Sequence, residues 1–322
     1  MKLTGFEAML IQRIEKLVER GNLDNISRTK CYESFYFNYP EITWSLLAGI
    51  VSRNAGWHMC DLKGPYLSHI LKPSFRQKLF YILERANWLI FRDAYPQLLV
   101  YHYSTLWKMP LFHILPHFSV SKFMQNEWER FWKERNSERL LYALIINEQN
   151  VIQKPVIEHP DHQEILFRSL IYRMQERFSI CYVLLPSAYG KLYGFPVKDF
   201  TDVHKRIELG KRLAQVLFSP HLFPEFKKFV QTVEPTGSRW DYEQKVPGMC
   251  RSRSRPLRMT YPVIHHEPVV IEPWDQVVPI QQKWFQSPSI KTIDPITHYF
   301  MKKQKEIKYL SYIKRILVGL SK

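Results

Sequence analysis

Apolar residues recur three or four positions apart along much of the chain, which is the spacing of one face of an α-helix. The first predicted helix ends at Gly21, a residue type that suits a helix C-cap. Its apolar face is formed by Leu3, Phe6, Met9, Leu10, Ile14, Leu17 and Val18. The pattern therefore predicts an amphipathic helix at the start of the sequence.

The same spacing predicts helices through most of the following chain. Ser121 suits the N-cap of a helical segment at 122–147, which forms either one long helix or two abutting ones. Proline and glycine predict irregular chain at 110–118 and a loop at 186–196. The other predicted helices cover 27–37, 41–58, 74–94, 96–107, 161–179, 224–233 and a segment from 199 or 201 to 217.

The pattern changes after residue 245. Eight of the 21 prolines lie in residues 246–295, and this density excludes ordinary helices and central strands there. The segment also contains Trp274, Trp284 and Phe285, so it is too apolar for a free linker. We expect a helical body at 1–245, a Pro-rich arm at 246–295 that wraps the body, and a basic amphipathic helix at 296–322.

Composition supports a mainly α fold, an irregular multi-helix globular body with an extended arm and a basic C-terminal helix. The 322 residues are 45% hydrophobic, enough to offset the ordering entropy of folding, and include only 11 glycines. The longest apolar runs, 140–146 and 180–185, are far shorter than the ~20 residues of a membrane span. With no signal-peptide pattern at the start and no CxxC among Cys31, Cys60, Cys181 and Cys250, we expect free thiols and a cytoplasmic location.

Several runs resemble the YppC-like family, a domain-of-unknown-function group of low-GC Gram-positive bacteria. They are SRNAGWHMCDLKG at 52–64, ANWLIFRDAYPQLLVY at 86–101, INEQN at 146–150 and TGSRWDYE at 236–243. The resemblance extends to about residue 275. It implies a cytosolic helical protein of a bacterium, and it implies no activity and no catalytic residues.

Several familiar chemistries are missing from the sequence. The chain has no G-x-x-x-x-G-K-[ST], G-x-G-x-x-G, G-x-S-x-G or H-E-x-x-H motif, and none of its 12 histidines has Asp or Glu three residues before it. Kinases, P-loop NTPases, Rossmann dehydrogenases, zincins and ordinary α/β-hydrolases are therefore poor candidates. We predict no cofactor and no metal site, because the His58-x-Cys60-Asp61 spacing fits no standard zinc set.

Three polar runs carry candidate site residues. Arg53 and Asp61 are eight residues apart on one predicted helix face, where Arg53 and Asn54 are either anion ligands or parts of a buried structural ion pair. Glu148 ends an apolar helix, where burial would raise its pKa and suit a general acid, and helix capping is the alternative.

The third run is TGSRWDYE, in which Thr236, Ser238 and Arg239 are an anion-binding candidate beside Asp241. The alternative is a turn in which Arg239 pairs with Asp241 or a neighbouring helix. The candidate residues of all three runs can serve one reaction only if they meet in a single cleft.

Positive charge is concentrated near the end of the chain. The sequence has 46 Lys+Arg against 30 Asp+Glu, and residues 239–322 hold 15 of the former and seven of the latter. In extended chain, Arg251, Arg253 and Arg255 point the same way at intervals of about 6.6 Å. They can follow a phosphate backbone or lie on acidic helices of the body. The last helix has a stripe at Ile307, Leu310, Ile313 or Lys314, Leu317 and Leu320, which suits docking onto the body or onto an anionic membrane or polymer.

Three functional hypotheses follow. The first is a non-catalytic protein that binds a polyanion, with nucleic acid favoured over a peripheral membrane contact because arginine suits phosphate. The second is a hydrolytic or phosphate-directed enzyme whose cleft gathers Arg53, Asp61, Glu148, Arg239 and Asp241. The third is a structural or assembly protein, which buried Arg53 and Arg239 would favour.

Overall fold

The computed structural model describes residues 3–164, 181–249, 251–252, 254–267, 273–290 and 292–320. The fold is mainly α. The first half comprises α1 Gly5–Gly21, α2 Asn25–Asn38, α3 Thr43–Leu62, α4 Leu67–Ile70, α5 Pro73–Trp107, the 3-10 helix η1 Phe112–Phe118, α6 Lys122–Glu134, α7 Ser137–Val151 and the π-helical turn η2 Gln153–Ile157. The second half comprises α8 Pro160–His162, β1 Tyr182–Pro186, β2 Leu192–Pro196, α10 Val203–Leu217, α11 Phe223–Thr232, α12 Trp240–Glu243, α13 Leu257–Thr260, η4 Trp274–Gln276, η5 Gln282–Phe285 and α14 Thr297–Leu320.

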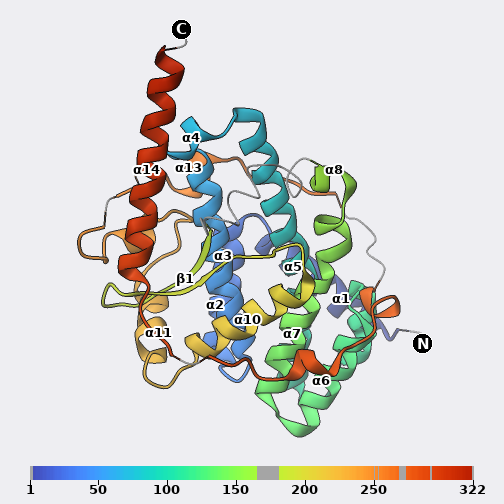
Figure 1. Cartoon of the computed structure of the whole chain (residues 1–322). Helices are drawn as coiled ribbons and strands as arrows, with labels where there is room; N and C mark the ends of the chain where they lie inside the picture. The colour runs from blue at the N-terminus through green and yellow to red at the C-terminus, as the bar shows by residue number, and fades with distance from the viewer. Residues whose placement is uncertain are drawn as a thin grey trace.

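Helix α3 lies at the centre of the body, in contact with α2, α5, α7 and α10 (Figure 1). Its side chains from Trp44 to Ile50 are all buried, as expected of a helix that is apolar on every side. Gly49 and Gly56 allow close approach to α3, because an added Cβ at Gly56 would lie 3.0 Å from the Cα atom of Gly237. The candidate residues of α3 are therefore held inside the core.

Side-chain caps set the starts of several helices. The predicted N-cap Ser121 is confirmed, because its Oγ accepts a hydrogen bond from the Met124 N–H at the start of α6. The segment 122–147 forms two helices, which was one of the two predicted alternatives. Helix α10 begins later than predicted, because Asp202 accepts the capping hydrogen bonds in place of Asp199 or Thr201. Of the helix predicted at 161–179, residues 165–180 lie outside the described part of the chain.

Helix α5 corrects the prediction of two helices separated near Pro96. One helix runs from Pro73 to Trp107 with Pro96 in its interior. Proline removes one backbone hydrogen bond. However, Pro96 is buried and so are the residues that follow it up to Tyr101, so the packing of this stretch outweighs the lost bond. The segment predicted to be irregular at 110–118 likewise forms the 3-10 helix η1.

The loop predicted at 186–196 is instead the second strand and turn of an antiparallel hairpin. Tyr182 pairs with Pro196 and Pro186 pairs with Leu192. In this two-stranded sheet the outer edge of each strand has no neighbouring strand. A proline at a strand end therefore loses no interstrand hydrogen bond on the outer edge. The prediction was wrong because Pro186 and Pro196 mark the strand ends and not a loop.

The Pro-rich segment lies along the body and is held by aromatic side chains. The Trp274 indole N–H donates to Asn147 Oδ1 at 2.8 Å, and the Trp284 indole N–H donates to His204 Nδ1 at 2.7 Å. Tyr261 stacks on Phe80 of α5 with ring centroids 3.7 Å apart. These contacts tie the segment to α5, α7 and α10.

Helix α14 runs along one side of the body and extends past α4 (Figure 1). Its buried side chains are Phe300, Ile307 and Ser311. The predicted docking stripe is wrong at Leu310, which is 54% exposed. Of the alternatives Ile313 and Lys314, Ile313 is 55% exposed, and Lys314 donates to the carbonyl oxygen of Ile70. Phe300 and Gln304 contact the body in place of Leu310, because they face Tyr182 and Arg239. Of Leu317 and Leu320 no side chain is described.

Candidate functional site

Arg53 forms a buried structural ion pair with Glu33 of α2. Its Nε atom donates to Glu33 Oε1 at 2.6 Å and its Nη2 atom donates to Glu33 Oε2 at 2.9 Å. The guanidinium faces the ring of Phe229. Burial raises the pKa of the Glu33 carboxyl even though Arg53 opposes the shift. The geometry matches the structural alternative, since the fork that would bind an anion already holds a carboxylate.

Asn54 joins α3 to the hairpin. Its Nδ2 atom donates to the carbonyl oxygen of Leu184 at 2.8 Å, and its Oδ1 atom accepts from the Leu184 N–H at 2.7 Å. The side chain therefore satisfies both backbone groups of one strand residue. This is a positioning role, and it leaves Asn54 engaged where an anion ligand was predicted.

Asp61 of α3 and Arg239 form an ion pair, which matches the structural alternative in which Arg239 pairs with a neighbouring helix. The Arg239 Nε atom lies 2.5 Å from Asp61 Oδ2. Burial raises the pKa of Asp61 to about 6, against the lowering effect of Arg239. Helix α14 covers the pair, because Arg239 Nη1 donates to Gln304 Oε1 and the Phe300 ring lies 5.5 Å from the guanidinium.

Asp241 closes the turn that contains Thr236. Its Oδ1 atom accepts from the Thr236 N–H at 3.1 Å and the Thr236 hydroxyl at 2.6 Å. Its Oδ2 atom accepts from the Trp57 indole N–H at 2.9 Å. Gly237 takes a φ of +69° in this turn, which favours glycine. The Ser238 hydroxyl donates to the Ser254 carbonyl oxygen at 2.8 Å, so the hydroxyls predicted to bind an anion hold the fold together.

Glu148 lies away from these groups. Its Oε2 atom accepts from the Trp44 indole N–H at 3.1 Å, and burial raises its pKa to about 7. Trp44 precedes Trp57 by 13 residues on α3, which is about 20 Å of helix axis. The structure therefore brings Asp61 and Arg239 together as a pair, whereas Arg53 pairs with Glu33 and Asp241 bonds Trp57 and Thr236. Glu148 lies near the opposite end of α3.

The basic run 251–255 turns its serines inward and its described arginines outward. Ser252 donates to Glu243 Oε2 through its N–H at 2.9 Å and its hydroxyl at 3.0 Å. Arg251 and Arg255 are both exposed, in line with the prediction that they point the same way, and Arg253 lies outside the described residues. We call residues 251–255 the arginine strip.

Trp240 is a surface residue that the sequence pattern did not single out. Its side chain is 48% exposed, and the Arg251 guanidinium lies 5.9 Å from the ring centroid. The sequence signal that could have found it was its place between Arg239 and Asp241, which both point inward. An exposed indole beside an arginine provides a flat apolar face and a positive charge on the same surface.

Asp93 of α5 is a buried carboxyl that the sequence pattern also left unmarked. Its Oδ2 atom accepts from the side-chain amides of Gln97 and Asn147, and burial raises its pKa to about 7. Asn147 in turn accepts from Trp274. The network connects α5, α7 and the Pro-rich segment, so it serves the packing of the arm.

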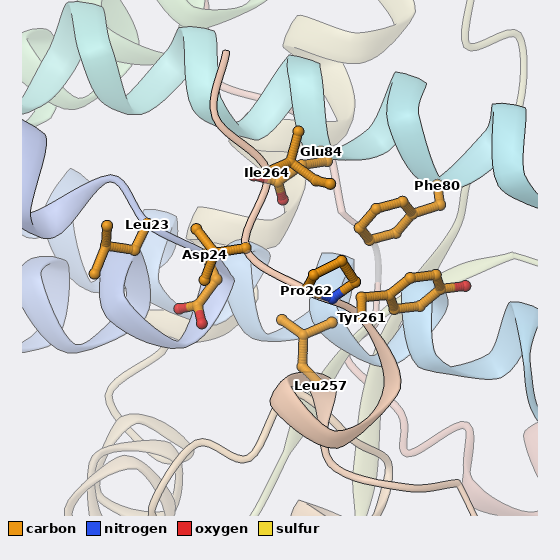
Figure 2. Close-up of a pocket in the computed structure, with 9 residues that line it drawn as sticks. Leu23, Asp24, Phe80, Glu84, Leu257, Tyr261, Pro262 and Ile264 are labelled. Atoms are coloured by element: carbon orange, nitrogen blue, oxygen red, sulfur yellow. The ribbon is translucent and has the colours of Figure 1, made fainter.

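A small hollow lies where residues 257–264 cross α5 and the start of α2 (Figure 2). Phe80 and Tyr261 border one side, and Asp24 binds Arg258 at 2.7 Å. The cavity volume is about 10 Å³, which is room for about one water molecule. The hollow is therefore part of the contact between the Pro-rich segment and the body, and it is too small for an organic ligand.

The described part of the chain contains neither a group of metal-ligating side chains nor a membrane-spanning helix. Across the described ranges, no three His, Cys, Asp or Glu side chains are grouped so that they could hold a metal ion. Among the same residues, no helix combines the length and the apolar character needed to cross a membrane. Cys31, Cys60 and Cys181 carry free thiols, and Cys250 lies outside the described residues.

The chain belongs to the DUF2515 family, whose model is described as a protein of unknown function and matches residues 20–286. It is similar to the "Uncharacterized protein YppC" of Bacillus subtilis (strain 168), with 50% identity over 257 residues that cover 80% of each chain. The resemblance drawn from the four sequence runs is confirmed. No solved structure matches the chain.

Proposed function

We propose that this protein is a non-catalytic, cytoplasmic binder of nucleic acid, and that the arginine strip and Trp240 form its contact surface. The observation that carries the proposal is the alternation of buried serines with exposed arginines beside an exposed indole. Arginine pairs with phosphate, and an aromatic face stacks on an unpaired base whatever its sequence. A single strand, whose bases are accessible, is the form that this pairing suits best.

Charge adds support to the proposal. The segment from 239 onward carries half of the formal net charge of +16 in about a quarter of the length. Ser252 fixes the strip to Glu243, so the two described arginines are presented without a loop having to order itself on binding. Binding through phosphates releases counterions and is weakened by salt.

The two alternatives draw different support from the geometry. The enzyme hypothesis required one cleft, but Arg53 is paired with Glu33 and Arg239 with Asp61. Asp241 is bonded to Trp57 and Thr236, and Glu148 lies elsewhere. A structural or assembly role is favoured by one observation, the burial of Arg53 and Arg239 in structural pairs. That role and the nucleic-acid proposal differ in whether the strip has a ligand.

Fluorescence anisotropy of labelled oligonucleotides tests the proposal. We expect the intact chain to bind a single strand more tightly than a duplex, with affinity falling steeply between about 50 and about 200 mM salt. Changing Arg251→Gln and Arg255→Gln should weaken binding. It should also reduce the magnitude of the salt slope by about 2, because two phosphates are no longer neutralised by arginine.

The matched control is Lys16→Gln with Lys133→Gln, two exposed residues of α1 and α6. It removes the same charge and should leave the affinity nearly unchanged. Equal losses of affinity in both variants would mean that only net charge attracts the oligonucleotide, and the strip would not be a site. Absence of binding by the intact chain would overturn the proposal and favour the structural role.

A further inference from the structure

Helix α14 has an apolar face that the body does not cover. Tyr309, Ile313 and Ile316 follow one another at i, i+4 and i+7, so they share one side of the helix. Their exposed fractions are 67%, 55% and 61%. Leu310 and Tyr312 flank this side and are also at least half exposed. We call these five residues the outer face of α14.

The outer face lies away from the contacts that hold α14 in place. Phe300, Gln304, Ile307 and Ser311 form the inward side, which meets Arg239 and Tyr182. The second half of α14 also contacts α4, where Lys314 Nζ donates to the carbonyl oxygen of Ile70 at 2.7 Å. In Figure 1 the outer end of α14 extends past α4, with no drawn element beside it. The face is a cluster of five large apolar side chains within eight residues, which is the kind of patch that marks an interaction surface.

Positive charge surrounds this apolar face. Helix α14 contains six Lys or Arg residues and a single acidic residue, Glu306. Glu306 is already paired with Lys303 at 2.8 Å. Lys302 lies on the same side as Tyr309, seven positions earlier, and Lys305 lies one turn before Tyr309; both are exposed. A partner of this face must therefore offer negative charge next to an apolar phase.

We propose that the outer face of α14 binds the surface of an anionic lipid bilayer, with the helix lying in the plane of the interface. Leucine and isoleucine would enter the boundary of the acyl chains, and the lysines would contact the headgroups. Tyrosine suits this depth because its ring is apolar and its hydroxyl is polar.

Two other occupants satisfy only part of this chemistry. A second copy of the chain would cover the apolar residues, but it would bring two strongly basic helices together. A nucleic acid would satisfy the lysines and leave the leucine and isoleucines in water. The bilayer is the one surface of the three that provides both the charge and the apolar region.

Vesicle flotation with the full chain tests the inference. The vesicles are phosphatidylcholine alone and phosphatidylcholine mixed with phosphatidylglycerol. We expect binding to the mixed vesicles and little to the neutral ones. The variant Leu310→Ser, Ile313→Ser, Ile316→Ser should reduce binding to the mixed vesicles by about tenfold or more, since it removes three aliphatic side chains from the contact. The three residues are exposed, so the fold should be preserved, which circular dichroism checks.

The matched control is Met9→Ser, Leu106→Ser, Val277→Ser, three residues that are 67%, 59% and 67% exposed on other parts of the body. It should bind the mixed vesicles like the natural sequence. Unchanged binding by the α14 variant would show adsorption through charge alone and would overturn the inference, as would no binding by the natural sequence. A dimer in light scattering that the α14 variant dissociates would assign the face to a second copy instead.

The inference is independent of the proposed function. It uses the side of α14 opposite the contact with Arg239, and the flotation assay contains no nucleic acid. The family model ends at residue 286, before α14 begins. The inference therefore rests on a helix outside the span that the family model matches.

Discussion

Asp93 and Glu148 show how single residues in this molecule combine burial with neutral hydrogen-bond donors. Amide N–H groups hold Asp93, and an indole and an amide N–H hold Glu148. Such donors lower the pKa of a carboxyl, but less than burial raises it, and both pKa values reach about 7. Arg53 and Arg239 offset the cost of burial in another way, because each buried guanidinium is paired with a carboxylate of opposite charge.

The raised pKa of Asp93 predicts a pH-dependent stability. Because its pKa rises from 3.8 unfolded to about 7 folded, the native state binds more protons than the unfolded state between these values. Its contribution to stability is therefore full below about pH 4 and is lost as the pH rises to 7. Asp93→Asn cannot ionise, so it should gain stability relative to the natural sequence on going from pH 5 to pH 8.

Urea denaturation of both forms at the two pH values measures this difference. The comparison isolates position 93, because His58 and Glu148 titrate equally in both proteins. The lowered pKa values of Asp24 and Glu84 have their effect near and below pH 4 and leave this range undisturbed. A stability difference that does not change with pH would contradict a raised pKa at Asp93.

At the scale of elements, local signals predicted most helices, and tertiary packing decided the exceptions. Ser121 was found because an N-cap depends on its own side chain and the next turn. The continuation of α5 through Pro96 and the burial of Phe300 in place of Leu310 depend on neighbours distant in sequence, which periodicity cannot reveal. In the candidate site, strand alternation predicted that Arg251 and Arg255 point the same way, but not that this side faces solvent. The partners of Arg53 and Arg239 could not be predicted, because they lie 20 or more residues away on other elements.

The β1–β2 hairpin depends on one glycine. Gly194 has a φ of +132°, and an added Cβ would lie 2.0 Å from the carbonyl oxygen of Val183 on the paired strand. Gly194→Ala should therefore disrupt the hairpin and lower the free energy of unfolding by more than about 2 kcal/mol. Gly5→Ala is the control, because an added Cβ there meets no atom within 4 Å. Thermal unfolding of the two variants tests the claim, and equal melting temperatures would refute it.

At the scale of the whole molecule, the arginine strip with Trp240 and the outer face of α14 lie on different sides of the contact between Arg239 and Gln304. Arg239 binds Asp61 and Gln304, so it joins α3 to the inward side of α14. Its neighbour Trp240 faces solvent beside Arg251, whereas the outer face of α14 points the other way from Gln304. The central ion pair therefore holds both surfaces on the same rigid part of the fold without merging them.

This arrangement predicts that both ligands bind at once. A labelled single strand should float with vesicles that contain phosphatidylglycerol only when the protein is present, because neither anion attracts the other. The Arg251→Gln, Arg255→Gln variant should float without the strand, and the α14 variant should leave both strand and protein in the dense fraction. If the vesicles instead displace the strand from the natural protein, the two anions compete for one surface. The separation of the strip from the outer face would then be wrong, even if each binds the protein alone.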